Sequence, residues 1–396
     1  MNEHSKVKIG IVIPSGFHKH PELFGGGYVR LSRIYNFLDK KLDIIKIIYN
    51  ISTSFIVNFL LSVISIIKAS YAIRRYGAIA VVTANPSPID VRIGCTVSKI
   101  ARVIHVVFVN AVPLTGYVGY KSANPEGLSS LQWILNVIRH SRKQLTTSII
   151  EAISYYVVFK CLMDSVVVPL TPDVASTLRK MGLTCVEPIS GVGCTRFRTS
   201  GRRWIDAVYV ASPLHPDKGV YNIVDIWELV SREKPNAKLL IVGREEPHYN
   251  LSLLNQYLWE KKLKNVKILS SKRGIPNEIV VNIVSQAKLF VYPTKKDVTP
   301  LVISEALGCG TPVITYDLPG IRLAYGNCEA VIRITTGDKK LFAQEVLRLL
   351  NNQKELEKLR EAAIKWCDDN SWQKVALKTL YTYLKAILLG YYLRTK

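Results

Sequence analysis

The chain has 396 residues, of which 48% are hydrophobic, and this predicts a folded protein of two domains rather than a disordered chain. Lysine and arginine (53) outnumber aspartate and glutamate (30), so a net charge of +23 should attract phosphate-bearing partners, whether anionic lipid or nucleic acid. Seven scattered cysteines without a C-x-x-C pair argue against a zinc site or a disulfide framework and favour a reducing, cytoplasmic location.

Apolar runs and helical patterns alternate along the chain, which is typical of an α/β protein with parallel sheets. In the first half, strands are expected near 7–13, 43–49, 78–83, 103–109 and 165–168, and helices near 26–39, 53–75, 89–101 and 147–163. In the second half, strands are expected near 206–211, 238–242, 266–269, 288–292 and 312–315. Helices there are expected near 218–233, 249–262, 276–286, 300–307 and 339–350, followed by a last helix near 373–388.

Three glycines, Gly25, Gly26 and Gly27, lie between the first predicted strand and the first predicted helix. Glycines remove side chains where a backbone must approach a ligand, and the following helix N-terminus favours an anion. The pattern is not G-x-G-x-x-G, so the dinucleotide fingerprint is absent. This loop either binds a phosphate or is an ordinary loop.

Positive charge is concentrated in residues 44–150, which hold 11 basic and two acidic residues. From Ile47 to Ile67 there are 21 uncharged residues, in which serine and asparagine recur at helical spacing. Residues 131–143 run from an aromatic and aliphatic cluster around Trp133 into cations. Each segment is either a core-facing helix or a helix at a membrane interface. A membrane span over 47–67 is a third alternative, which the apparent strand end at 49–50 disfavours.

Two carboxylates eight residues apart, Asp297 and Glu305, flank a predicted helix start. Thr299 is a suitable N-cap, and Pro300 suits the first helical position, because its missing N–H would be unpaired there anyway. Gly308 can end this short helix. The free N–H groups of the first turn would face the loop, where they and the two carboxylates suit a phosphorylated sugar.

This stretch resembles the Glu-x7-Glu signature of retaining GT-B glycosyltransferases, in particular glycosyltransferase family 4, with Asp297 in place of the first glutamate. The resemblance implies that Asp297 contacts the donor sugar and that Glu305 contacts the ribose of the nucleotide. In that family, backbone amides between the two acids hold the diphosphate. Because proline has no N–H, Leu301 and Val302 would make this contact here.

Other segments resemble the same family in the same order. Residues 189–197 resemble its interdomain segment, with Gly193 in place of an aspartate. Residues 239–243 resemble the next buried strand of the second domain, and 371–372 resemble a tryptophan position near the C-terminal helix. The resemblance spans roughly residues 7 to 384 and is more specific in the second half.

The family resemblance also implies which residues bind the donor phosphates. Residues 208–219 resemble the strand and loop that carry the phosphate-binding cation, which would be Lys218. Many relatives have an arginine just after this strand, where the present chain has Ser212, and Arg244 is the nearest substitute in sequence. With Gly26, Gly27 and Thr299, these residues complete the expected donor-binding set.

His105 and Asn110 flank the predicted strand 106–109. Relatives often place a histidine at the end of this strand, near the transferred sugar, and Asn110 occupies that position here. Both are therefore candidates for the acceptor or sugar side of the site. A lone histidine is more often structural, which applies equally to His18 and His20 in the loop after the first strand.

The resemblance implies a GT-B fold, in which two Rossmann-like domains face each other across a cleft. The first domain would comprise residues 1–198 and the second residues 204–372, with a polar linker between them. The helix at 373–396 would pack back on the first domain.

The implied activity is transfer of a sugar from a nucleotide-sugar to a glycan or lipid-linked acceptor, with retention at the anomeric carbon. Lys218, Asp297 and Glu305 are the candidate catalytic residues, and the enzyme would act in the cytoplasm or on the cytoplasmic face of an anionic membrane. No metal or other cofactor is expected, because cations and helix ends supply positive charge in this class. Three alternatives remain open: a GT-B enzyme that modifies nucleic acid, a catalytically inactive nucleotide-sugar-binding relative, and a non-glycosyl GT-B enzyme such as a sugar-nucleotide epimerase.

Overall fold

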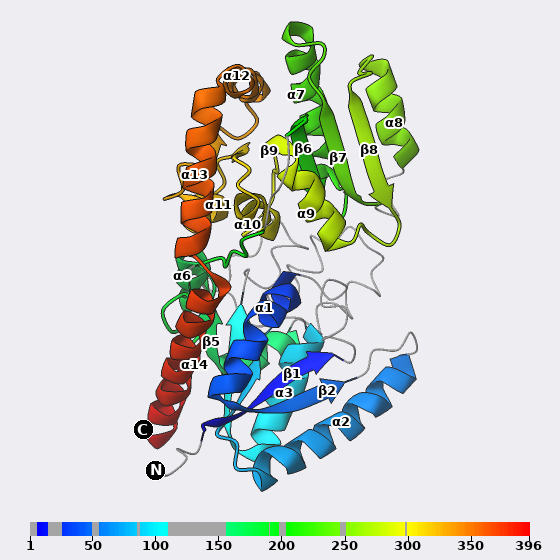
Figure 1. Cartoon of the computed structure of the whole chain (residues 1–396). Coiled ribbons are helices and arrows are strands. Elements are labelled where there is room, and N and C mark those ends of the chain that lie inside the picture. Colours follow the sequence, from blue (N-terminus) through cyan, green and yellow to red (C-terminus); the bar gives the residue numbers. More distant parts are fainter. Residues whose placement is uncertain are drawn as a thin grey trace. The chain divides into compact units, whose positions relative to one another are not determined.

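The computed structural model describes residues 6–14, 26–49, 55–84, 88–109, 156–189, 191–197, 203–245, 251–297 and 299–396. The chain divides into two compact units (Figure 1). Unit 1 comprises Met1–Ser190 and Gln373–Lys396, and unit 2 comprises Gly191–Trp372. The division therefore falls at Ser190, before the boundary expected at 198–204, and the C-terminal helix belongs with the first half of the sequence.

Unit 1 is built on a five-stranded parallel sheet with the order β2-β1-β3-β4-β5. The strands are β1 (Lys8–Pro14), β2 (Asp43–Tyr49), β3 (Ala80–Thr83), β4 (Ile104–Val109) and β5 (Val166–Pro169). The helices are α1 (Gly26–Lys41), α2 (Phe55–Arg75), α3 (Pro88–Ala101), α6 (Pro172–Lys180) and α14 (Trp372–Thr395), with a further helical stretch at 156–163. Every residue of β3, β4 and β5 is buried, as expected of strands in a parallel sheet covered by helices.

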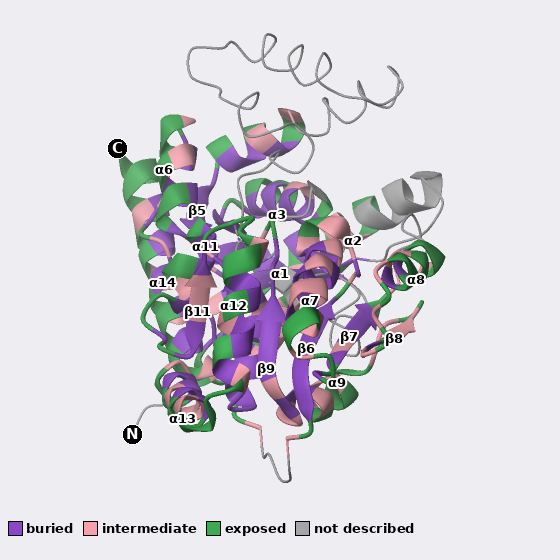
Figure 2. Ribbon diagram, turned by 90° about the horizontal axis from the view of Figure 1, so that it is seen from above, coloured by how far each residue is buried: buried purple, intermediate pink, exposed green. Residues whose placement is uncertain are grey.

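Unit 2 is built on a six-stranded parallel sheet with the order β11-β10-β9-β6-β7-β8. The strands are β6 (Ile205–Ala211), β7 (Leu239–Arg244), β8 (Val266–Ser271), β9 (Ala287–Tyr292), β10 (Val313–Tyr316) and β11 (Val331–Ile334). The helices are η2 (Pro216–Lys218), α7 (Val220–Glu233), α8 (Leu251–Glu260), α9 (Asn277–Ser285), α10 (Leu301–Gly308), α11 (Pro319–Tyr325), α12 (Lys339–Leu350) and α13 (Gln353–Asp369). Figure 2 shows that β6, β7 and β9 are largely buried and that exposed residues lie on the outward faces of the helices.

The uncharged run at 47–67 divides between two elements of unit 1. Its first three residues complete β2, and residues 55–67 form the first part of α2. Among the described helices, none is long and apolar enough to cross a membrane.

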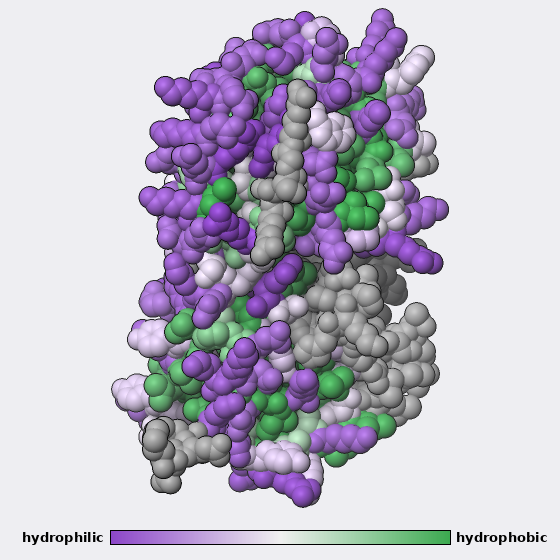
Figure 3. All heavy atoms as spheres, viewed as in Figure 1, coloured by the Kyte–Doolittle hydropathy of each residue, from purple (hydrophilic) through white to green (hydrophobic). Residues whose placement is uncertain are grey.

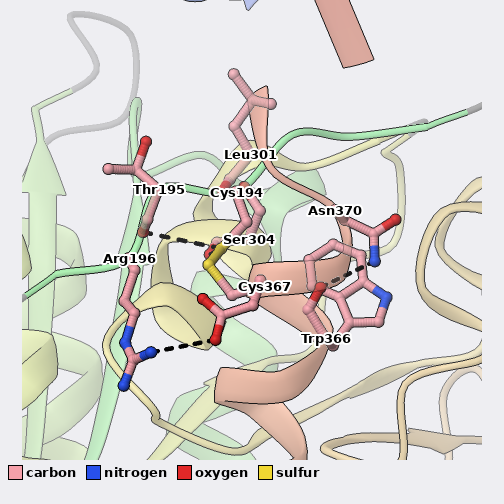
Figure 4. The surroundings of a disulfide bond; sticks show 9 residues. Cys194, Thr195, Arg196, Leu301, Ser304, Trp366, Cys367 and Asn370 are labelled. Carbon is pink, nitrogen blue, oxygen red and sulfur yellow. Dashed lines mark hydrogen bonds and ion pairs between the residues drawn. A yellow bond between two sulfur atoms is a disulfide. The ribbon is translucent and has the colours of Figure 1, made fainter. Parts of the chain in front are cut away.

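Two of the seven cysteines form a disulfide, which corrects the expectation that the chain contains none. Cys194 and Cys367 are joined across 173 residues, with an S–S distance of 2.06 Å and a Cα–Cα distance of 5.1 Å. The bond joins the segment after Ser190 to the end of α13, beside α10 (Figure 4). The other five cysteines are free. Spacing alone could not predict this pair, because the two residues meet only after unit 2 has folded.

The segment that enters unit 2 is also hydrogen-bonded to the segment that leaves it. The N–H of Cys194 donates to the carbonyl oxygen of Asn370 at 2.8 Å, and a Cβ at Gly193 would lie only 2.2 Å from the Trp372 ring. Arg196 Nη1 lies 3.1 Å from Asp368 Oδ2 (Figure 4). Glycine at 193 therefore lets the Trp372 ring lie against the backbone.

Candidate active site

The strand order of unit 2 creates a site where two neighbouring connections diverge. β6 and β9 are adjacent, yet the chain passes from β6 to β7 on one side and from β9 to β10 on the other. Ligands of open α/β sheets bind outside the carboxyl ends of the strands at such a switch point. Functional side chains are therefore expected in the loops after β6 and β9.

The loop after β6 is compact and ends with a glycine that no other residue could replace without rearrangement. The turn η2 ends at Gly219, which has a φ of 86° and is the N-cap of α7. A Cβ at this position would lie 2.0 Å from the carbonyl oxygen of Pro293, in the loop after β9. Gly219 thus allows the two loops to pack backbone to backbone, and the N-terminus of α7 begins between them.

Backbone hydrogen bonds join the same two loops. The N–H groups of Lys295 and Lys296 donate to the carbonyl oxygen of Asp217, at 2.9 and 3.2 Å. This pairing fixes the register of the β9 loop against η2. As a result, the residue that follows Asp217 lies opposite the residue that follows Lys296.

Those two residues are Lys218 and Asp297, and their side chains form an ion pair. Lys218 Nζ lies 2.6 Å from Asp297 Oδ2, and the side chains are 30% and 14% exposed. The Tyr292 hydroxyl, at the end of β9, donates to the same carboxylate oxygen at 2.9 Å. The structure therefore brings together two of the three predicted catalytic residues, 79 positions apart in sequence, and adds a tyrosine that the sequence analysis missed.

The buried phenols beneath this ion pair stay protonated at neutral pH. Burial, followed by the negative charge of Asp297, raises the pKa of Tyr292 well above its ordinary value. The pKa of Tyr209 is raised by the same two causes, and its hydroxyl donates to the Lys218 carbonyl oxygen at 2.9 Å. Both tyrosines therefore act as hydrogen-bond donors that position Asp297 and Lys218.

Helix α10 contributes the remaining candidates of the acidic motif. It begins at Leu301 with Pro300 as its N-cap, so the predicted start, with Thr299 as N-cap, was one residue early. The N–H groups of Leu301 and Val302 lie in the first turn, where they have no intrahelical acceptor. Glu305 is half-buried one turn further along, where it lines a small apolar gap with Val302 and other side chains of β6, α9 and α10.

Ser212 and Arg244 also lie at the carboxyl edge of this sheet. Ser212 follows β6 and is exposed, and the peptide bond between it and Pro213 is cis. Arg244 is the exposed last residue of β7, and its carbonyl oxygen accepts from the Leu214 N–H at 2.8 Å. Ser212 and Arg244 therefore lie at the carboxyl ends of two neighbouring strands.

The candidates from the first half of the sequence belong to unit 1. Gly26 and Gly27 open α1. His105 is 2% exposed, with Nε2 2.9 Å from Thr83 Oγ1 and Nδ1 2.7 Å from Ser165 Oγ, and burial lowers its pKa. It is a neutral histidine of the core, and we remove it from the candidate set. Asn110, His18, His20 and Trp133 lie outside the described residues.

The comparison with protein families concerns the unit that carries this site. Residues 206–366 match the family described as Glycosyl transferases group 1. Unit 2 contains a glycosyl transferases group 1 domain. The match covers all of unit 2 from β6 to near the end of α13, including Lys218, Asp297 and Glu305.

One curated protein and two solved structures place the domain in a wider context. The capsular polysaccharide biosynthesis glycosyltransferase CapM of Staphylococcus aureus is 26% identical over 145 residues, which are 37% of this chain and 36% of that protein. Sucrose-phosphate synthase from Thermosynechococcus elongatus superimposes with a TM-score of 0.70 at 15% identity, over 96% of this chain and 99% of its own. HepE of Anabaena, solved in complex with UDP, superimposes with a TM-score of 0.56 at 15% identity, over 96% of this chain and 100% of its own.

The similarity to the two solved structures extends over both units, whereas the match to CapM covers about a third of that protein. Together with the two parallel sheets, they confirm the predicted fold class, GT-B with two Rossmann-like domains. The family match confirms the coarser functional prediction, a glycosyltransferase, for the domain that contains the site.

Proposed function

We propose that the protein transfers a sugar from a nucleotide-sugar to a hydroxyl group of an acceptor and retains the configuration at the anomeric carbon. The observation that supports this most directly is the Lys218–Asp297 ion pair at the switch point of unit 2, between the N-termini of α7 and α10. A cation and two helix N-termini suit a diphosphate, and a carboxylate suits sugar hydroxyls.

In the proposed reaction, the bond between the anomeric carbon and the diphosphate oxygen breaks, and a bond to the acceptor oxygen forms on the same face. The acceptor proton passes to the departing phosphate oxygen, so no protein base is needed. Lys218 and the N–H groups of Leu301 and Val302 stabilise the charge that grows on the diphosphate. Asp297 holds a sugar hydroxyl, and Glu305 binds the ribose.

We propose that this chemistry needs no metal ion, because the positive charge that a metal would supply comes from side chains and helix ends. Lys218 stands beside the N-terminus of α7, and Arg244 adds a second cation at the same sheet edge. The donor is proposed to be a UDP-sugar, because HepE was solved with UDP. The resemblance to CapM supports a glycan acceptor.

Nucleotide-sugars that bind the folded protein should raise its melting temperature. UDP-sugars are expected to do so at lower concentrations than sugars linked to other nucleotides. At a ligand concentration about 100 times Kd, the expected stabilisation is about 2.7 kcal/mol. Glu305→Ala should shift the concentration dependence to higher donor concentrations without changing the melting temperature of the free protein by more than a few degrees. Glu361→Ala, on the exposed side of α13, is the matched control.

The stabilising donor is then incubated with candidate acceptors, and proton NMR of the anomeric signal reports the stereochemistry. An α-linked donor should give an α-linked product. A β-linked product would contradict retention but leave the transferase assignment intact. Donor binding with no transfer to any glycan or lipid-linked acceptor would instead favour an inactive, nucleotide-sugar-binding relative.

We further propose that unit 1 binds an anionic membrane surface, where a lipid-linked acceptor would be presented. The support comes from the outer face of α2, on which Ile64, Ile67 and Tyr71 recur at helical spacing and are 49%, 62% and 64% exposed. Lys68 and Arg75 lie on the same stretch, and the Arg75 guanidinium is 5.9 Å from the Tyr71 ring centre. Figure 3 shows hydrophobic and hydrophilic residues interleaved on the visible face of unit 1.

Binding to anionic liposomes should weaken in high salt but persist in part, because ionic attraction of about 1 kcal/mol per cation is screened and apolar insertion is not. Ile67→Glu should remove much of the salt-resistant part in a sedimentation assay. Leu341→Glu, a similar change at a 42% exposed leucine of unit 2, is the control and should bind like wild type. Steeply salt-dependent binding to duplex DNA without liposome binding would replace this proposal by the nucleic-acid alternative.

A further inference from the structure

A cavity lies at the edge of the sheet of unit 2 opposite the candidate active site. It has a volume of about 630 Å³ and lies where β6, β7 and β8 begin. Strands of six residues span about 20 Å, so the cavity is well separated from the loops at their carboxyl ends. Its volume is within the range of small-ligand pockets, about 300–1,000 Å³.

All of the charged side chains that line this cavity are positive. Four exposed lysines line it, and no aspartate or glutamate does; the lysines are Lys238, Lys262, Lys264 and Lys267. Within the part of the chain that the structure describes, none of the four forms an ion pair, although the nearby Lys261 pairs with Glu228 at 2.7 Å. Lys262 also takes a left-handed backbone conformation with a φ of 54°, which is unfavourable for a non-glycine residue. The cavity therefore attracts multivalent anions.

A tryptophan gives the cavity a flat apolar wall. Trp204 is 57% exposed, and its Nε1 donates to Gln286 Oε1 at 2.6 Å, which fixes the orientation of the indole. Lys238 Nζ lies 6.0 Å from the ring centre, so the cation and the aromatic face are presented together. A ligand with both an apolar face and negative charge fits this wall.

Side-chain amides and a hydroxyl complete the lining. Both amide protons of Asn265 are used, in hydrogen bonds to Ser231 Oγ at 2.9 Å and to the Ala237 carbonyl oxygen at 2.6 Å, and its Oδ1 accepts from Ser231 Oγ at 3.3 Å. Asn265 therefore offers a ligand only the second lone pair of Oδ1, whereas the amide of Asn236 is exposed next to it. Amides both donate and accept hydrogen bonds, as recognition of hydroxyl groups requires. Sugars offer hydroxyl groups together with the apolar C–H face that an indole ring can cover.

We propose that this lysine-rimmed cavity binds an acidic oligosaccharide, a chain of sugars that carry carboxylate, sulfate or phosphate groups. The sugar rings lie against Trp204, the acidic groups meet the four lysines, and the hydroxyls meet the amide of Asn236 and the Oδ1 of Asn265. Single-stranded nucleic acid binds along rows of aromatic side chains, and a membrane surface is met by protruding apolar residues, whereas this site is concave with one aromatic wall. The proposal does not depend on the transferase activity, because binding needs neither donor nor catalysis.

The test is isothermal titration of the intact protein with tetragalacturonate in about 0.1 M salt, where charges more than about 10 Å apart are largely screened, with neutral maltotetraose as the matched ligand. Tetragalacturonate should bind and maltotetraose should bind at least about tenfold more weakly, which corresponds to 1.4 kcal/mol. Lys264→Glu with Lys267→Glu should weaken tetragalacturonate binding by about tenfold or more, since two attractions become repulsions. Trp204→Ala should weaken binding while leaving its salt dependence unchanged.

The control is Lys354→Glu with Lys365→Glu, which makes the same charge change at exposed positions of α13. Its affinity should stay within about twofold of wild type, because screening removes distant charge effects. An equal loss in this control, or no binding of tetragalacturonate, would overturn the proposal. Tighter binding of a ten-residue oligothymidylate or of anionic vesicles through the same two lysines would also overturn it.

Discussion

Replacing Lys218 by alanine is expected to lower the turnover number for sugar transfer by about 10²- to 10³-fold, the usual effect of removing one group that stabilises transition-state charge. Donor affinity should change much less, because the charge on the diphosphate grows as the bond to the sugar breaks. Lys218→Arg should retain a substantial part of the rate, since it keeps a cation next to Asp297. Steady-state kinetics with the donor found by thermal stabilisation measure both parameters.

The ion pair itself can be tested with a double-mutant cycle. Asp297→Asn keeps the shape of the side chain but removes its charge, and its loss should not add to that of Lys218→Ala, because the two groups touch. Lys340→Ala, at an exposed position of α12, controls for the general loss of positive charge. Wild-type turnover in Lys218→Ala, or a loss confined to donor binding, would show that Lys218 has a different role.

Loss of the Cys194–Cys367 disulfide should destabilise unit 2 by about 2–5 kcal/mol, because the bond closes a loop of 173 residues in the unfolded chain. For a domain of this size, that corresponds to a fall in melting temperature of about 4–20 °C. Cys194→Ser, Cys367→Ser and the double variant should be equally destabilised, since either single change removes the whole bond. Calorimetry measures these shifts.

Reductant provides the matched control for the disulfide. Dithiothreitol should lower the melting temperature of the wild-type protein but not that of Cys194→Ser. Thiol titration of the denatured, unreduced chain should find five thiols rather than seven. Seven thiols, with no response to reductant, would contradict the bond.

Most of the fold could be predicted because apolar runs report burial directly. β4 and β6 are buried at every position, and such strands stand out as continuous hydrophobic segments. α13 was missed although its signal is present: Asn352 caps it, and Leu356, Leu359 and Ala363 are buried at helical spacing. α11 was missed because seven residues are too few to show a period.

The candidate site was only partly predictable, because motifs identify residue types and not their partners. The acidic motif singled out Asp297, but its pairing with Lys218 depends on the hydrogen bonds of Asp217 to the β9 loop. Only one weak feature of the sequence points to Tyr292 as a site residue: it is the last residue of a predicted strand, and ligands bind beyond the carboxyl ends of strands. Glu305, Leu301 and Val302 occupy the predicted helix, and their contacts with a donor stay a prediction. The role proposed for Asn110, which lies outside the described residues, stays a prediction as well.

The joined entry and exit of unit 2 have a consequence for how the chain can be rearranged. Gly193 lies against Trp372, and Cys194 is bonded to both Asn370 and Cys367, so residues 191–372 begin and end at one point. In topological terms, this segment is an insertion between residues 190 and 373 of unit 1, and its two ends are joined covalently by the disulfide. We therefore expect two cuts, near residues 190 and 373, to release this segment as one polypeptide that folds with its own disulfide.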